Sequence, residues 1–169
     1  LLADARRVVD LCAAPGSWSQ VLAHKLRQHE ESRIVAVDLQ LMAPITGVVQ
    51  LQGDITKLET AERVLQELGG SADLVVCDGA PDVTGLHDMD EYVQGQLLLA
   101  ALTIVVHVLR EGGVFVAKVF RGRDSDILVE QLRLFFPDVR YYKPASSRDS
   151  SLEAFVVARR FSLPTGFRA

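Results

Sequence analysis

The chain has 169 residues, enough for one domain with a sizeable core but too few for a second domain. Hydrophobic residues make up 49% and charged residues 24% of the chain, and no run approaches the ~18 uninterrupted apolar residues of a membrane span. The net charge of −4 argues against a protein that holds nucleic acid through an overall positive field, so any RNA contact must be local.

The two cysteines, Cys12 and Cys77, fall at the ends of predicted buried strands and belong to no C-x-x-C or His-rich cluster. This favours reduced thiols that act as small hydrophobic residues over a disulfide or a metal site, and it suits a cytoplasmic protein. Residues 1–4 are no signal peptide. They include no initiator methionine and lead almost at once into a strand, so we expect further residues upstream.

The first predicted strand, residues 8–12, runs through a tight turn into an amphipathic helix for which Ser17 is the expected N-cap. Within the turn, Pro15 ends the strand pairing and Gly16 lets a ligand approach the backbone. A dinucleotide would need a G-x-G-x-x-G loop, so a single glycine favours an uncharged or zwitterionic ligand. The alternative is an ordinary turn that binds nothing.

Three more strands are predicted at residues 33–38, 48–52 and 73–77, with a helix at 60–68 before the last of them. An aspartate follows each strand, and parallel crossovers place Asp38, Asp54 and Asp78 at one edge of the sheet. Asp38 stands where an acidic residue grips ribose hydroxyls, although it could instead cap a helix or a turn. Asp54 could accept a hydrogen bond from an exocyclic amine such as that of adenine.

A long helix is predicted at residues 90–109, with Gly112 and Gly113 ending it, and a fifth strand at 114–120. That strand is hydrophobic except for Lys118. A buried lysine is energetically costly, which points to a function, although a lysine at a strand end can also extend its ammonium into solvent.

The last elements are a helix at residues 125–136 and strands at 139–142 and 152–158. The link between the two strands is too short for a crossover helix, so they should form an antiparallel hairpin. The final strand then begins at the edge where its parallel neighbours end, which brings Glu153 to Asp78 and Lys118. An Asp, a Lys and a Glu beside a nucleoside pocket suit a polar group transfer without a covalent enzyme intermediate.

Six stretches carry a further signal: DLCAAPGSWSQ (10–20), IVAVDLQ (34–40), QGDIT (52–56), DLVVCDGAPDVTGLHD (73–88), FVAKVFRGRD (115–124) and SSRDSSLEAF (146–155). Together they resemble the FtsJ-type RNA ribose 2′-O-methyltransferases, and most of all the eukaryotic enzymes that modify the tRNA anticodon loop. The resemblance covers residues 8–161. It implies a Rossmann-like class I α/β fold with helices on both faces of a seven-stranded, mostly parallel sheet whose last strand is antiparallel, formed as a single domain over 1–169.

The resemblance also implies S-adenosylmethionine as cofactor and S-adenosylhomocysteine as product. By motif, Gly16, Ser17 and Trp18 would bound the methionine end of the cofactor. The other cofactor-binding residues would be Asp38 at the ribose, Asp54 at the adenine edge and Asp78 beside the sulfonium.

The family's catalytic set is Lys-Asp-Lys-Glu, and its last three members match Asp78, Lys118 and Glu153. The family's first lysine lies in a helix before the first strand and has no match here, so we expect it in a missing N-terminal segment. The resemblance implies in-line attack of a ribose 2′-hydroxyl, with Lys118 accepting the proton. Because the two carboxylates favour a charged lysine, Lys118 could instead stay an ammonium that steadies the alkoxide.

Arg121, Arg123, Lys143 and Arg148 flank the expected site and are candidates for RNA phosphate contacts, although they could be plain solvated loop charges. So small a cationic surface suggests an auxiliary protein subunit that positions the RNA. The favoured function is ribose methylation of tRNA. The alternatives are ribosomal RNA or mRNA-cap ribose methylation by the same chemistry, and a non-catalytic S-adenosylmethionine-binding subunit.

Overall fold

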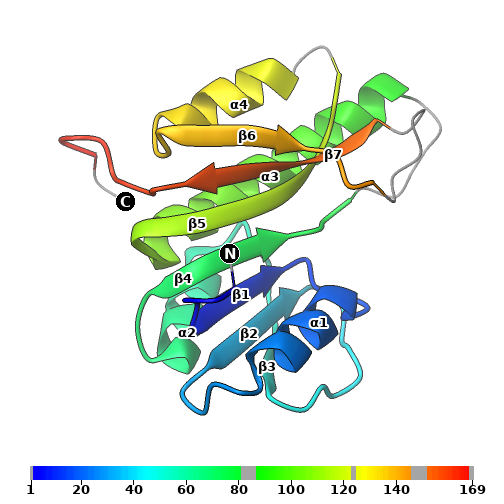
Figure 1. The fold of residues 1–169 in the computed structure, drawn as a ribbon. Helices are drawn as coiled ribbons and strands as arrows, with labels where there is room; N and C mark the ends of the chain where they lie inside the picture. The colour runs from blue at the N-terminus through cyan, green and yellow to red at the C-terminus, as the bar shows by residue number, and fades with distance from the viewer. Residues whose placement is uncertain (1, 81–86, 123–124, 146–151, 168–169) are drawn as a thin grey trace.

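The computed structural model describes residues 2–80, 87–122, 125–145 and 152–167 (Figure 1). Along the chain its elements are β1 (Arg7–Leu11), α1 (Ser17–Leu26), β2 (Arg33–Asp38), β3 (Val48–Gln52), α2 (Leu58–Leu68), β4 (Ala72–Cys77), α3 (His87–Val108), β5 (Leu109–Phe120), α4 (Ser125–Arg133), β6 (Asp138–Tyr142) and β7 (Glu153–Arg159).

Seven strands form one sheet in the order β3-β2-β1-β4-β5-β7-β6 within the described residues. The pairs from β3 to β5 are parallel, whereas β7 runs antiparallel to both of its neighbours, β5 and β6. The predicted mostly parallel sheet with an antiparallel last strand is therefore confirmed. The start of β7 lies at the edge of the sheet where the parallel strands end.

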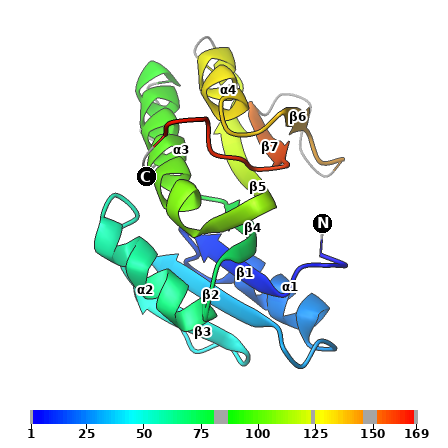
Figure 2. The same ribbon diagram turned by 90° about the vertical axis from the view of Figure 1, so that its left-hand side faces the viewer.

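Helices cover both faces of the sheet, as predicted, with α1 on one face and α2, α3 and α4 on the other (Figure 2). Alternation along β1 sends Val9 and Leu11 into the core under α2 and α3, and Val8 into a smaller core under α1. The central strands are buried on both faces, which is why their sequences are continuous apolar runs rather than alternating ones.

Some predicted element ends are wrong. Helix α1 begins at Ser17, and its N-cap is Gly16 in the left-handed region at φ 112°, with no side-chain capping bond. Helix α4 ends at Arg133 rather than at residue 136. Helix α3 ends within one residue of its predicted end, but Gly112 and Gly113 do not end it: they lie inside β5, which begins at Leu109 rather than at residue 114 and whose register with β4 shifts there. The glycines are held there because Gly112 N–H donates to Phe161 O and Phe161 N–H donates to Gly113 O.

Residues 89–108 of α3 have the length and mean hydropathy, 1.3, of a membrane-spanning helix. In the fold this segment packs against β4, β5, α2 and α4, and residues such as Leu98, Ile104 and Val105 are buried in the core. Length and hydropathy alone do not separate a core helix from a membrane span, so they are weak evidence for a membrane here.

At the opposite edge of the sheet, the Asp73 carboxylate joins three strands. Asp73 Oδ2 accepts hydrogen bonds from the amides of Arg6 (2.8 Å) and Arg7 (2.9 Å), and Oδ1 pairs with Arg110 Nε at 2.6 Å. Partial burial raises the pKa of this carboxyl, but the bonds from Arg110 and the two amides outweigh it, so the pKa is lowered.

We therefore predict that Asp73→Asn lowers the free energy of unfolding at pH 7 by about 1–3 kcal/mol. A carboxyl with a lowered folded pKa stabilises the protein above the ordinary value of 3.8 and loses that contribution as the pH falls through the folded pKa. The difference from wild type should then shrink towards pH 3 in urea titrations. Asp4→Asn, at an exposed position, is the control. A loss that is constant with pH would contradict this role of the charge.

Candidate active site

Asp38, Asp54 and Asp78 line one cavity of about 800 Å³ at the edge where the parallel strands end. The predicted convergence of three carboxylates is confirmed. Cavities of roughly 300–1,000 Å³ are typical of small-molecule sites. The remaining wall comes mainly from the turn after β1, the segment after β2 and one side of α3, so three separate crossovers build the site.

The Asp38 carboxylate holds two loops in place. Its Oδ2 accepts a hydrogen bond from Ala14 N–H at 2.9 Å, and its Oδ1 accepts one from Gln40 N–H at 2.8 Å. A carboxylate oxygen can accept more than one bond, so Asp38 can take a ligand hydroxyl while it fixes the turn after β1.

Asp54 is held by its own turn. Its Oδ1 accepts bonds from Thr56 N–H (2.9 Å) and from the Thr56 hydroxyl (2.7 Å). These bonds lower the pKa of Asp54, so the side chain is an anion at neutral pH. An ionised carboxylate at this rim accepts hydrogen bonds and cannot donate them.

The turn residues Gly16, Ser17 and Trp18 do not line this cavity. A Cβ on Gly16 would lie 2.8 Å from Ile45 Cδ1, so glycine at φ 112° lets the segment after β2 pack onto the turn. Ser17 and Trp18 instead line a second, apolar cavity of about 550 Å³. The predicted role of these three residues at the methionine end stays a prediction.

Lys118 lies between two carboxylates, as predicted. Its Nζ is 3.1 Å from Asp78 Oδ1 and 4.0 Å from Glu153 Oε1, and only 12% of its side chain is exposed. β5 carries the lysine and β7 brings Glu153 to it, because the antiparallel register pairs Phe120 with Glu153. Lys118 therefore does not extend into solvent from a strand end.

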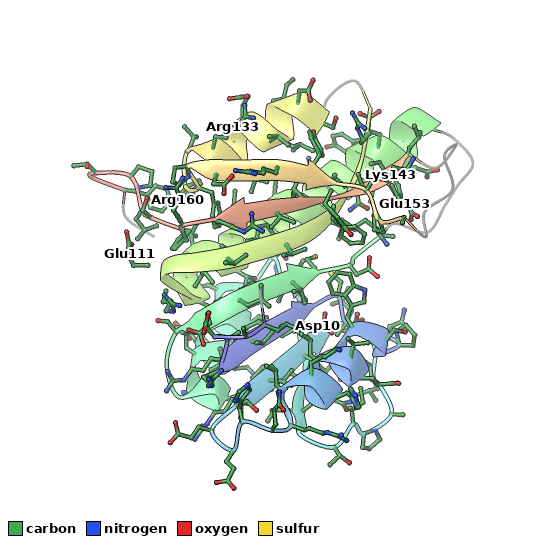
Figure 3. All side chains as sticks on the ribbon, viewed as in Figure 1. Asp10, Glu111, Arg133, Lys143, Glu153 and Arg160 are labelled. Atoms are coloured by element: carbon green, nitrogen blue, oxygen red, sulfur yellow. The ribbon has the colours of Figure 1, made fainter. Side chains whose placement is uncertain are left out.

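The second cavity lies on the same face of the sheet as Lys118. This cavity is lined by Val116, which lies two residues before Lys118 on β5. It is also lined by Phe155, which pairs with Lys118 across the β5–β7 register. Trp18 packs on Phe155 with ring centroids 5.5 Å apart, and Tyr142 closes the β6 side. The charged cluster thus stands between the two cavities, and Figure 3 shows Glu153 at the start of β7.

Sequence reasoning missed Gln94, a buried residue of α3. Its Nε2 donates to Gly79 O at 3.0 Å and to Lys118 O at 2.9 Å, which ties the backbone after Asp78 to the backbone of Lys118. The signal was a polar residue one turn before Leu98 on the apolar stripe of the helix. Gln94 is a positioning residue for the ion pair.

Gln94→Leu should lower the free energy of unfolding by about 1–3 kcal/mol for each carbonyl that it leaves buried without a partner. Part of this loss is offset, because the substitution also removes Gln94 Oε1, a buried oxygen with no hydrogen-bond partner among the described protein atoms. Gln20→Leu, on the exposed face of α1, is the matched control in the same urea titration. Equal stabilities of the two variants would contradict the bridging role.

Sequence reasoning also missed Asp10, which is fully buried in β1 (Figure 3). The Ser19 hydroxyl donates to its Oδ2 at 2.6 Å, while Oδ1 has no partner among the described protein atoms. Burial raises the pKa of Asp10 to about 6, opposed by the Ser19 bond and assisted by the charges of Asp78 and Asp38. The carboxylate therefore adds a buried negative charge behind the site at neutral pH.

Because the folded protein binds the Asp10 proton more tightly than the unfolded chain does, stability should fall as the pH rises from about 4 to about 6. The cost above pH 6 is roughly 3 kcal/mol for a shift of this size. Asp10→Asn should remove this pH dependence and raise the free energy of unfolding at pH 7.5, whereas the exposed control Glu111→Gln should not. A variant less stable than wild type at pH 7.5 would contradict this assignment.

The candidate RNA contacts are only partly described. Arg121 is exposed, with its guanidinium carbon 5.4 Å from the centre of the Tyr141 ring, and Lys143 is exposed after β6. Arg123 and Arg148 lie outside the described residues. Within the described residues, Arg121 and Lys143 are therefore the candidates that remain for phosphate contacts.

A family model for FtsJ-like methyltransferases matches residues 1–161. The chain is 61% identical over 168 residues to a mouse tRNA (cytidine(32)/guanosine(34)-2′-O)-methyltransferase, covering 99% of this chain and 52% of the mouse protein. It is 63% identical over 162 residues to the human protein of the same name, covering 95% of this chain and 49% of that protein. The chain thus spans about half the length of these relatives.

Among solved structures, one is of a Plasmodium falciparum protein assigned to the ribosomal RNA methyltransferases. It superimposes with a TM-score of 0.82 at 24% identity, covering 95% of this chain and 89% of that one. This likeness supports the Rossmann-like architecture.

Proposed function

Because this chain belongs to the FtsJ-like methyltransferase family, we propose that it transfers a methyl group from S-adenosylmethionine to a ribose 2′-hydroxyl of RNA. The names of the mouse and human relatives support tRNA, and within it the anticodon loop, as the substrate. The observation that carries the proposal is the placement of Lys118 between Asp78 and Glu153 at the rim of a cavity of nucleoside size.

The residues around the cavity fit this cofactor. Asp38 can accept a ribose hydroxyl, and the ionised Asp54 can accept a bond from the adenine amine. The turn after β1 offers a single glycine and no phosphate-binding loop, which suits a nucleoside without phosphates. S-adenosylmethionine supplies a methyl group on a sulfonium, and the cluster of carboxylates gives that cation a favourable field.

Lys118 is the residue that we assign to stabilising the negative charge on the attacking oxygen. As an ammonium paired with Asp78, its Nζ can donate to the 2′-oxygen and stabilise the negative charge that develops there. A base must instead be neutral, and a neutral amine would forgo the ion pair with Asp78 that the structure shows. The geometry therefore favours the electrostatic role in the arrangement that the structure describes.

The chain spans about half the length of its relatives, so the proposal includes residues that this sequence does not contain. The family's first catalytic lysine has no counterpart here, and we propose that a segment preceding Leu1 supplies it. The second, apolar cavity lies beside Lys118 and is lined in part by Leu2, which supports a position for the preceding segment near the site. The small cationic surface supports an auxiliary RNA-positioning subunit, and the substrate supports a cytoplasmic location.

The test is nucleoside mass spectrometry of unmodified tRNA treated with the full-length protein and S-adenosylmethionine. We expect 2′-O-methylated nucleosides from the anticodon loop. Lys118→Met should lower the rate at least a hundredfold, whereas the exposed Lys25→Met should not change it. Lys118→Arg keeps the charge but cannot act as a base near neutral pH, so partial activity indicates the electrostatic role and complete loss indicates the base.

Full activity of Lys118→Met would contradict the proposed site. Methylation of ribosomal RNA or capped mRNA in place of tRNA would shift the substrate and leave the chemistry intact. Cofactor binding in calorimetry without methylation of any of these RNAs would favour a non-catalytic subunit.

A further inference from the structure

Two thiols that the proposed reaction does not use lie close together at the cofactor cavity, one in its wall and one behind it. Cys12 and Cys77 are both free, and a Cβ placed on Gly79 would lie 2.9 Å from Cys12 Sγ and 3.6 Å from Cys77 Sγ. Strands β1 and β4 are neighbours, and the residue paired with Cys77 is Leu11, directly before Cys12. Adjacent strands therefore present both sulfurs to the same glycine.

The backbone of Cys12 is what brings the sulfurs together. In a regular strand, Cys12 would point away from the face that Leu11 occupies. Its φ of 56° breaks this alternation, and its side chain packs against the same core cluster that contains Leu11 and Cys77. A non-glycine residue in this region is uncommon and is held there by its surroundings.

The environments of the two thiols differ. Cys12 is half-buried and lines the cavity, so small solutes can reach it, whereas Cys77 is 4% exposed and does not line the cavity. A hydrogen bond from the Cys77 thiol lowers the pKa of Cys12, and that bond together with burial raises the pKa of Cys77. The reachable sulfur is thus the one with more thiolate character, and thiolates are the reactive form.

We propose that Cys12 is an oxidation-sensitive thiol of the cofactor cavity, that Cys77 resolves its oxidised form as a disulfide, and that this bond controls cofactor binding. The thiol chemistry rests on the two sulfurs and their contact with Gly79. Only the identity of the cofactor rests on the proposed function.

The oxidant is a peroxide such as hydrogen peroxide. The Cys12 thiolate attacks one peroxide oxygen, so that an S–O bond forms, the O–O bond breaks, and the sulfur loses two electrons to the departing hydroxide. The Cys77 sulfur then attacks the sulfenic sulfur, forming the S–S bond and breaking the S–O bond. The released hydroxide takes up the Cys77 proton as water. A dithiol reductant then returns the Cys12–Cys77 disulfide to two thiols by exchange and is itself oxidised to a disulfide.

The bond should disturb the cofactor site because Cys12 begins the turn that holds Asp38. Ala14, two residues on, donates its amide to Asp38, and Gly79 on the other side of the sulfur also lines the cavity. A disulfide requires an S–S separation of about 2.05 Å, so the Cys12 side chain must be drawn towards β4. Because Cys12 Sγ lies against the backbone of Gly79, this movement displaces the turn or the cavity wall.

The test combines peptide mass spectrometry and calorimetry on purified protein before and after hydrogen peroxide. We expect one peptide pair linked through Cys12 and Cys77, a mass loss of two hydrogens, and at least a tenfold weaker Kd for S-adenosylhomocysteine that dithiothreitol restores. A Cys12 that stays reduced, or disulfide-linked protein with an unchanged Kd, would overturn the proposal. Reduced protein that does not bind S-adenosylhomocysteine would contradict the proposed function and the control of binding, while the peptide map still decides the disulfide.

Two further measurements separate the roles of the thiols. In wild type, iodoacetamide should label Cys12 and leave Cys77 unlabelled, and S-adenosylhomocysteine should slow the labelling at least fivefold. In Cys77→Ser, whose hydroxyl can still donate a hydrogen bond to Cys12 but cannot form a disulfide, peroxide should leave a Cys12 sulfenic acid that dimedone traps. Preferential labelling of Cys77, or no dimedone adduct in the variant, would contradict the assigned roles.

Discussion

The ion pair between Lys118 and Asp78 is the interaction on which the rest of the site depends. A lysine with 12% of its side chain exposed must be compensated, and Asp78 at 3.1 Å and Glu153 at 4.0 Å provide that compensation. Both carboxylates reach it through the sheet: β4 ends beside β5, and β7 begins beside the end of β5 because it is antiparallel. Reversal of one strand therefore brings the second carboxylate to the lysine.

Around this pair, hydrogen bonds between side chains and the backbone fix the positions of the strand ends and turns that carry the charged groups. Gln94 links the carbonyls of Gly79 and Lys118, and Asp38 holds the turn after β1 through the Ala14 amide. Asp10, buried behind the same edge, adds a negative charge at a cost in stability. Asp38, Asp54 and Asp78 line the cavity and Asp10 is buried behind it, so negative charge gathers at this edge of the sheet.

Most of the fold could be predicted because the strands are short apolar runs with an aspartate or a glycine at their ends. The bounds of β2 and β3 were predicted correctly, and the short link before β7 predicted its direction. The start of β5 was not, because Gly112 and Gly113 indicated a helix stop followed by a strand from residue 114. Their place inside β5 depends on pairing with Phe161, a contact distant in sequence that no local pattern contains.

The site was predictable to the same depth. Asp78, Lys118 and Glu153 could be brought together from strand order and direction alone, since each is at a strand end. The roles of Gln94 and Asp10 could not be predicted, because they depend on the hydrogen-bond partners that each buried side chain meets in the fold. The shared contact of Cys12 and Cys77 with Gly79 depends on one positive φ angle, which residue type does not reveal.

The most direct measurement is an experimental structure of the protein with S-adenosylhomocysteine. We expect the ribose hydroxyls to lie within hydrogen-bonding distance of Asp38 and the sulfur atom to face Lys118. A ligand seated between Trp18 and Tyr142, or a sulfur directed away from Lys118, would contradict the proposed site.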